Sequence, residues 1–147
     1  MTDSGIALER AGGDGLRYVE NLLDRAGLPT DDVDTETGRF YVARADGDAV
    51  GVGGFEVHGE DGLLRSVAVE ESARGAGHGT ALVDELEAAA RDAGVRRLFL
   101  LTTTASDFFA ARGYETIDRQ DAPATVRNTA EFAELCPSSA TAMSKTL

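Results

Sequence analysis

A glycine-rich segment at residues 74–80 carries the residue types best suited to binding a phosphate group. It contains, in order, Arg74, Gly75, Gly77, Gly79 and Thr80. Alternating glycines let successive backbone N–H groups turn toward one point, because no Cβ atom blocks the approach of a ligand. The arginine adds a full positive charge. The segment therefore predicts a site for a phosphate or pyrophosphate group, and a glycine-rich turn without a ligand is the alternative.

The spacing of these residues excludes two common nucleotide-binding loops. A P-loop requires Gly-Lys-Ser or Gly-Lys-Thr, but the one lysine of the chain is Lys145. A dinucleotide fingerprint requires a glycine where Thr80 stands. It also requires an acidic residue after the next apolar run, which instead ends in three threonines at positions 102–104. The pattern that remains is Arg-x-x-Gly-x-Gly between an expected strand and an expected helix.

Two charged residues lie inside segments that are otherwise apolar and strand-like. Glu56 is the one acidic residue in the segment 49–57, and it is a candidate general base acting through a water, with a surface carboxylate as the alternative. Arg65 needs an anion, either Glu56 or an oxyanion of a substrate, because it stands among apolar residues. The residues expected on its strand face are Leu63, Val67 and Val69. Arg127, on an expected C-terminal helix, is a second candidate substrate clamp.

The other side chains with useful chemistry predict no metal site. Cys136 is the only cysteine, so neither an internal disulfide nor a thiolate cluster is expected, and a small buried side chain is the simplest interpretation. His58 is expected in a turn, and His78 in the glycine-rich loop. We therefore expect no metal ion.

The chain is strongly acidic, with a formal net charge of −12 from 26 acidic and 14 basic residues. Such a surface repels nucleic acid and anionic membranes, so neither is expected as a partner. The acidic residues are spread along the chain and almost every basic residue is arginine, which favours adaptation to a salt-rich cytoplasm over an acidic binding tail. No apolar run approaches the ~20 residues of a membrane span and no signal-peptide pattern is present, so a cytoplasmic location is expected.

The hydrophobic pattern predicts one domain, residues 1–147, of the α/β class. Expected strands cover residues 6–8, 39–45, 49–57, 63–69, 95–101, 114–118 and 141–147. Expected helices cover residues 14–26, 80–93, 105–112 and 123–135, the third beginning with a capping box at 104–107. Three hairpin-linked strands between two helices predict a mixed, mostly antiparallel sheet with helices on both faces.

The Arg-x-x-Gly-x-Gly loop and this order of elements resemble the GCN5-related N-acetyltransferase (GNAT) family. The resemblance implies that the strands 63–69 and 95–101 splay apart and hold acetyl-CoA as co-substrate. It implies backbone contacts from Val67, Ala68 and Val69 to the pantetheine arm, and from the amides of Gly75 to Thr80 to the pyrophosphate. Phe109 stands where many members have a tyrosine that protonates the departing thiolate. It is therefore expected to line the cofactor, and the role of general acid is unfilled.

A narrower resemblance rests on Leu-Arg-Ser-Val-Ala-Val at 64–69, Leu-Leu-Thr-Thr-Thr at 100–104 and the tail 127–140. These segments resemble the arsenic-resistance subgroup of the family. The resemblance implies acetyl transfer to a small, amino-acid-like amine that carries an oxyanion. Acetylation of a protein N-terminus or lysine, and a CoA-binding sensor without turnover, are the alternatives, and a homodimer is left open.

Overall fold

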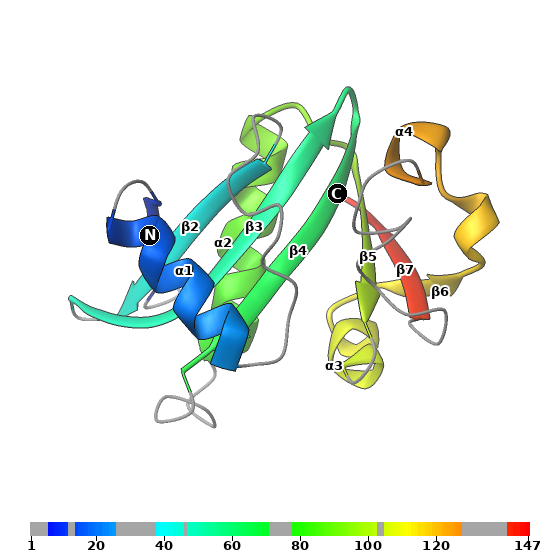
Figure 1. Cartoon of the computed structure of the whole chain (residues 1–147). Helices are drawn as coiled ribbons and strands as arrows, with labels where there is room; N and C mark the ends of the chain where they lie inside the picture. Colours follow the sequence, from blue (N-terminus) through cyan, green and yellow to red (C-terminus); the bar gives the residue numbers. More distant parts are fainter. Residues whose placement is uncertain are drawn as a thin grey trace.

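The computed structural model describes residues 6–11, 14–25, 38–45, 47–70, 78–102, 105–127 and 141–147 (Figure 1). Its strands are β1 (Ala7–Arg10), β2 (Gly38–Ala45), β3 (Asp48–His58), β4 (Asp61–Val69), β5 (Arg97–Thr102), β6 (Glu115–Ile117) and β7 (Thr141–Thr146). Its helices are α1 (Asp14–Arg25), α2 (His78–Asp92), α3 (Ser106–Ala111) and α4 (Ala124–Arg127), with a 3₁₀ turn, η2, at Arg119–Asp121. None of the helices within these ranges is long and apolar enough to cross a lipid bilayer.

The seven described strands form one sheet in the order β1-β2-β3-β4-β5-β7-β6. Every neighbouring pair is antiparallel except β4 and β5, which run parallel. Three apolar clusters place α1 and α4 on one face of the sheet and α2 and α3 on the other (Figure 1). The predicted α/β fold, with a mixed and mostly antiparallel sheet between helices, is therefore confirmed.

A bulge in β4 reverses the alternation of its side chains. Gly54 of β3 pairs with Arg65, whereas Val52 pairs with Ala68, so β4 advances three residues while β3 advances two. Arg65 and Ala68 consequently lie on the face covered by α1, and Val67 packs with α2 on the opposite face. The prediction that Arg65 shares a face with the valines of this strand is wrong, because strict alternation holds only where no extra residue is inserted.

The parallel pairing between β4 and β5 is short. It joins Asp61–Leu63 to Arg97–Phe99, and within the described chain β4 then continues to its end without another pair to β5. Figure 1 shows the two strands close together near the β3–β4 hairpin and separating toward their other ends. The sheet therefore has two halves, β1 to β4 and β5-β7-β6, which meet along three residue pairs. The predicted splay of these two strands is confirmed.

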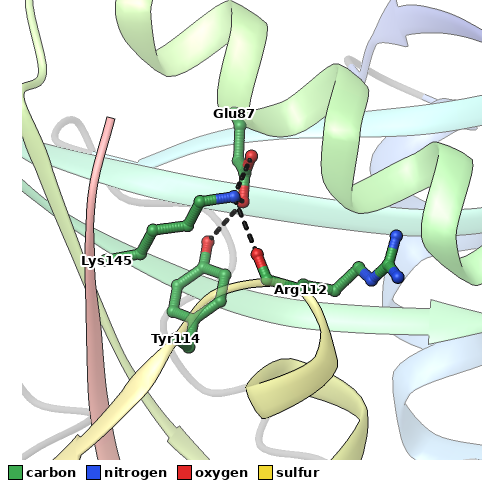
Figure 2. A network of polar contacts seen from close by, with 4 residues as sticks. All are labelled: Glu87, Arg112, Tyr114 and Lys145. Atoms are coloured by element: carbon green, nitrogen blue, oxygen red, sulfur yellow. Dashed lines mark hydrogen bonds and ion pairs between the residues drawn. The ribbon is translucent and has the colours of Figure 1, made fainter.

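A partly buried ion pair links the two halves on the face covered by α2. Glu87 of α2 has a side chain that is 4% exposed, and Nζ of Lys145 in β7 lies 2.9 Å and 3.0 Å from its two carboxylate oxygens (Figure 2). The same ammonium donates to the carbonyl oxygen of Arg112 over 2.8 Å. The Lys145 ammonium therefore has three acceptors, two on the side chain of Glu87 in α2 and one on the backbone that follows α3.

Tyr114 completes this network. Its hydroxyl donates to Glu87 over 3.0 Å. Burial, followed by the negative charge of Glu87, raises the pKa of the Tyr114 phenol, so the phenol keeps its proton and remains a donor. Because α2 packs against β3 and β4, while Tyr114 and Lys145 belong to the other half of the sheet, the network ties the two halves together.

We expect Lys145→Met to lower the free energy of unfolding by about 3 kcal/mol, because it leaves the buried Glu87 carboxylate without its counter-charge. Urea unfolding followed by circular dichroism would measure the loss. The matched control is the double variant Lys145→Met with Glu87→Gln, which removes both charges and keeps an acceptor for Tyr114. It should recover most of the stability, and equal stability of Lys145→Met and the wild-type protein would contradict this account.

Three local differences from the sequence prediction have physical causes. The predicted capping box of α3 is wrong, because the N-cap residue is Ala105, whose backbone N–H donates instead to Oγ1 of Thr102 over 3.0 Å. β1 ends two residues later than predicted, because Glu9 and Arg10 continue the pairing with β2. The predicted helix 123–135 is described only as α4, and the remainder, with Cys136, lies outside the described residues.

Candidate functional site

The N-terminus of α2 lies close to the end of β4 and to α3. A Cβ atom on Gly79, the second residue of α2, would lie 3.7 Å from the ring of Phe108 and 3.8 Å from Cγ2 of Val69. Three elements therefore meet at the positive end of a 15-residue helix, where the sequence predicts the pyrophosphate site. Thr80 is half-buried in the first turn of α2. The predicted contacts of Arg74, Gly75 and Gly77 lie outside the described residues and stay predictions.

The segment Val67–Val69 lies beyond the last pair between β4 and β5. On its other edge, β4 remains paired with β3 as far as Val69, which lies opposite Gly51. The side chains of this segment pack above and below the sheet, so they do not lie along the edge that faces β5. An extended ligand can add to an edge of this kind as a further strand. The geometry suits the predicted pantetheine contacts, which remain a prediction.

Phe108, and not Phe109, is the aromatic side chain beside Gly79. Phe109 is buried, and its ring packs edge-on against Phe108 at 5.1 Å and against Tyr114 at 5.5 Å between ring centroids. Phe108 is half-buried next to the first turn of α2. A contact from Phe109 to the cofactor stays a prediction, and Phe108 is a second candidate that the sequence analysis did not select. Neither ring can donate a proton to a leaving group.

We expect Gly79→Ala to weaken acetyl-CoA binding roughly 10- to 100-fold, the loss of about one hydrogen bond to a charged phosphate, while the fold survives. The new methyl group has room against Phe108 and Val69 but stands where a phosphate must approach the backbone. Isothermal titration calorimetry would measure the affinity.

The matched control for this experiment is Gly15→Ala in the first turn of α1. Its Cβ would lie 3.6 Å from Cβ of Ala11 and 3.9 Å from Cγ2 of Val42, which are ordinary contacts. It should leave acetyl-CoA affinity unchanged. Wild-type affinity in both variants would count against a pyrophosphate site at the start of α2.

Glu56, Arg65 and His58 form a hydrogen-bonded cluster on the face covered by α1 and α4. Nη1 of Arg65 donates to Oε2 of Glu56 over 2.9 Å, and Nε2 of His58 lies 3.0 Å from Oε1. The side chains are 0% exposed at Arg65, 6% at Glu56 and 17% at His58. The Arg65 guanidinium also lies over the ring of Phe40, 5.6 Å from its centroid. Both carboxylate oxygens have a partner, as a buried carboxylate requires.

This cluster lies beside the point where β4 and β5 separate. Glu56 is opposite Leu63 on β4, and Leu63 is opposite Phe99 in the last β4–β5 pair. Leu63 packs under α4 with Val126, whereas Phe40 belongs to the apolar cluster under α1. The three polar side chains therefore occupy the boundary between two apolar clusters. A carboxylate and an imidazole at this position can accept a proton, which transfer of an acyl group to an amine requires.

The structure brings together two of the residues predicted for catalysis and substrate binding, Glu56 and Arg65. Arg65 is paired with Glu56, which was one of its two predicted partners. Arg127 is the last described residue of α4, and the placement of its side chain lies outside the description, so its role stays a prediction. Among the residues that the structure describes, no three His, Cys, Asp or Glu side chains gather as they would around a metal ion.

His58 is the residue of this cluster that the sequence analysis missed. The sequence assigns it to a turn, whereas it is the last residue of β3. A signal was present, because residues two apart in a strand project from the same face, and His58 follows Glu56 by two positions.

A second polar group, also missed from the sequence, anchors the end of β4 against α1. The hydroxyl of Tyr18 donates to Oε2 of Glu70 over 2.5 Å, and Nη1 of Arg25 lies 3.2 Å from Oε1. The tyrosine hydrogen bond is the main cause that lowers the pKa of Glu70. Burial, followed by this hydrogen bond, raises the pKa of Tyr18. Because Glu70 directly follows β4, the contact fixes the point from which the chain leaves toward the glycine-rich segment.

The chain matches the model of the acetyltransferase (GNAT) family over residues 15–116, and the protein belongs to this family. It is 29% identical over 129 residues to an amino-acid acetyltransferase of Neisseria meningitidis serogroup A, covering 86% of this chain and 26% of that protein. It is 39% identical over 93 residues to an amino-acid acetyltransferase of Mycobacterium tuberculosis, covering 63% and 50% of the two chains. The chain thus spans about a quarter to a half of the length of these curated relatives.

Solved structures show the same fold. The Mycobacterium tuberculosis protein Rv2747, in complex with CoA and NLQ, matches with a TM-score of 0.79 and 28% identity over 96% of this chain and 99% of that chain. N-acetylglutamate synthase from Neisseria gonorrhoeae, complexed with coenzyme A and L-arginine, matches with a TM-score of 0.78 and 20% identity over 97% and 33%. At 20% identity, the similarity to the synthase from Neisseria gonorrhoeae concerns the fold alone.

Proposed function

We propose that the protein is an acetyl-CoA-dependent N-acetyltransferase whose acceptor is a small amino acid or an amino-acid-like amine. Membership of the GNAT family and the similarity to amino-acid acetyltransferases support the reaction and the acceptor class. CoA in the complex of the similar Mycobacterium protein supports the co-substrate. The observation that carries the proposal is the splay of β4 and β5, with α2 beginning at its open end and the Glu56 cluster at its closed end.

In this proposal, acetyl-CoA lies along Val67–Val69, and its pyrophosphate is bound by Arg74 and the amides of Gly75 to Thr80. Its thioester then lies toward the closed end of the splay. An amino acid carries its amine as an ammonium at neutral pH, so it must lose a proton before nitrogen can attack the thioester carbon. The C–N bond forms, the C–S bond breaks and the thiolate departs. The Glu56 cluster supplies the route for the proton of the amine.

The thiolate needs no side-chain acid in this scheme. The ring of Phe109 stands where many family members have a tyrosine, and it carries no proton to give. The ordinary pKa of a thiol is about 8.5, so the thiolate is a fair leaving group and water protonates it at neutral pH. Tyr114 follows Phe109 by five residues, but its hydroxyl donates its proton to Glu87 in a hydrogen bond.

The acceptor is proposed to carry a carboxylate or another oxyanion. Arg65 and Arg127 are the two candidates for holding it, because a guanidinium grips such a group through two parallel hydrogen bonds. Arg65 is fully enclosed and already pairs with Glu56, so we assign the anion contact to Arg127 and a supporting role to Arg65. The arsenic-resistance type of acceptor, an amino acid that bears an arsinate or a phosphinate, falls within the same class.

A screen of amines by thiol release from acetyl-CoA should show acetylation of carboxylate-, phosphinate- or arsinate-bearing amines well above that of plain alkylamines. Arg127→Ala should raise KM for the anionic acceptor roughly 10- to 100-fold, the effect of losing a charge-assisted contact, and leave KM for acetyl-CoA unchanged. The matched control is Arg91→Ala, an exposed arginine in the last turn of α2, which should change neither constant.

Other outcomes of the screen separate the alternative functions. Preference for spermidine-like polyamines or for peptide amines, with no effect of Arg127→Ala, would overturn the small-oxyanion acceptor. Tight binding of acetyl-CoA without thiol release in the presence of any amine would indicate a CoA sensor and overturn the proposed activity.

Glu56→Gln should lower turnover by roughly 10²- to 10⁴-fold, because it removes the negative charge from the proton-accepting cluster while keeping an acceptor for Arg65. Acetyl-CoA affinity, measured by calorimetry, should stay close to that of the wild type. Glu115→Gln provides the control, since Glu115 is an exposed carboxylate on β6 and should leave the rate unchanged. A near-wild-type rate of Glu56→Gln between pH 6 and 9 would remove Glu56 from the mechanism.

A further inference from the structure

We infer that His58 is the catalytic residue that accepts the proton of the acceptor amine, through Nδ1 of its ring, and that Glu56 acts through it as a positioning residue. The inference deepens the proposed N-acetyltransferase function and rests on it. The observations that carry it are the contact of His58 with Glu56, the enclosure of Glu56 and Arg65, and the position of Glu56 opposite Leu63, in the last β4–β5 pair before the splay.

The exposed fraction of the side chain rises from Arg65 through Glu56 to His58. Arg65 is fully enclosed, Glu56 is almost so, and His58 is the most exposed of the three side chains. A group that takes a proton from an acceptor and returns it to water has to reach both. His58 meets this requirement better than Glu56, whose two oxygens are turned toward Arg65 and His58.

The contact with Glu56 also fixes the chemistry of the imidazole. Nε2 lies 3.0 Å from Oε1 of Glu56, and a carboxylate at that distance accepts a hydrogen bond only if Nε2 carries the proton. The neutral ring then has its lone pair on Nδ1. In the described part of the chain, Nδ1 makes no hydrogen bond, so that lone pair is available to a substrate. When Nδ1 takes a proton, the adjacent carboxylate stabilises the positive ring.

Other charged groups near His58 are already paired. Asp61 is directly opposite on β4, and its Oδ1 accepts from Nε of Arg97 on β5 over 3.4 Å. On the far side of Glu56, the guanidinium of Arg65 balances the carboxylate. The residues of α4 with described side chains, Ala124, Thr125 and Val126, carry no charge. Glu56 is therefore the group that responds most directly to a charge on the His58 ring.

The proposed step balances in charge and atoms. Nδ1 takes one proton from the ammonium of the acceptor, and the resulting amine forms the C–N bond as the C–S bond breaks. The nitrogen loses a second proton to water as the amide forms, and the departing thiolate takes up one proton from water. The imidazolium then returns its proton to solvent, so that one proton is released for each amine acetylated.

The first test is the pH dependence of kcat/KM in the wild-type protein and in His58→Gln. A glutamine side chain still donates an N–H to Glu56 but cannot act as a base. The acceptor's own ammonium titrates equally in both reactions, so the ratio of the two rates at each pH removes its contribution. The ratio should rise with pH and reach a plateau of roughly 10² to 10⁴.

The second test is a double-mutant cycle. If Glu56 acts through His58, the double variant Glu56→Gln with His58→Gln should be about as slow as His58→Gln alone. Added imidazole should restore part of the rate of His58→Ala in a saturable manner. Circular dichroism and acetyl-CoA calorimetry would check that His58→Gln is folded. If it is not, the imidazole rescue of His58→Ala still tests whether His58 acts as the base.

Two results would overturn the inference. One is a rate ratio that stays flat between pH 5.5 and 8.5, and the other is a double variant whose loss equals the product of the two single losses. Each leaves the proposed function intact, because thiol release with an amine would still be observed. Absence of acetylation in the wild-type protein would instead overturn the proposed function itself.

Discussion

The parallel contact between β4 and β5, three residue pairs long in the described chain, is the interaction on which the rest of the structure depends. A longer ladder would close the sheet and leave no strand edge for an extended ligand, whereas no ladder would separate the two halves. Two sets of contacts outside the sheet therefore hold the halves together. The helix α2 packs on β3 and β4, and its Glu87 is bonded to Lys145 and Tyr114 of the other half (Figure 2). Because Glu87 is buried and Lys145 is only partly exposed, salt screens this network less than it screens an ion pair on the surface.

The bulge in β4 has a chemical consequence at the same place. Arg65 follows Leu63 by two positions and lies with it on the face of α1 and α4, next to Glu56, and the inserted residue after Arg65 sends Val67 to the face of α2. Without it, alternation would put Val67 on the same face as Arg65 and Glu56. The bulge thus separates a polar face, where a proton can be accepted, from an apolar face that supports the strand edge. It also lies just beyond the last β4–β5 pair, so both functions begin at one point of the sheet.

Local patterns explain which features the sequence could predict. Apolar periodicity and glycine turns define the order of elements, and the Arg-x-x-Gly-x-Gly segment follows β4 as expected, although α2 begins at His78, two residues earlier than predicted, and so includes Gly79. The features that it could not predict depend on residues that are distant in the chain. Lys145 and Glu87 are 58 positions apart, and Tyr18 and Glu70 are 52 apart, and no short-range pattern joins them. The bulge was missed because alternation was extended through it, and the contact of His58 because a turn was assigned one residue too early.

The unusual charge composition makes sense when buried and exposed charges are considered separately. A net charge of −12 repels an anionic co-substrate and an anionic acceptor, so binding depends on local cations and backbone amides. Exposed pairs such as Arg44 with Glu9 contribute little and weaken with salt, as the repulsion does. The single lysine of the chain lies in a position that suits an ammonium better than a guanidinium. Its three N–H bonds meet both oxygens of Glu87 and the carbonyl oxygen of Arg112 within 3.0 Å, a compact arrangement that a planar fork of donors cannot reproduce.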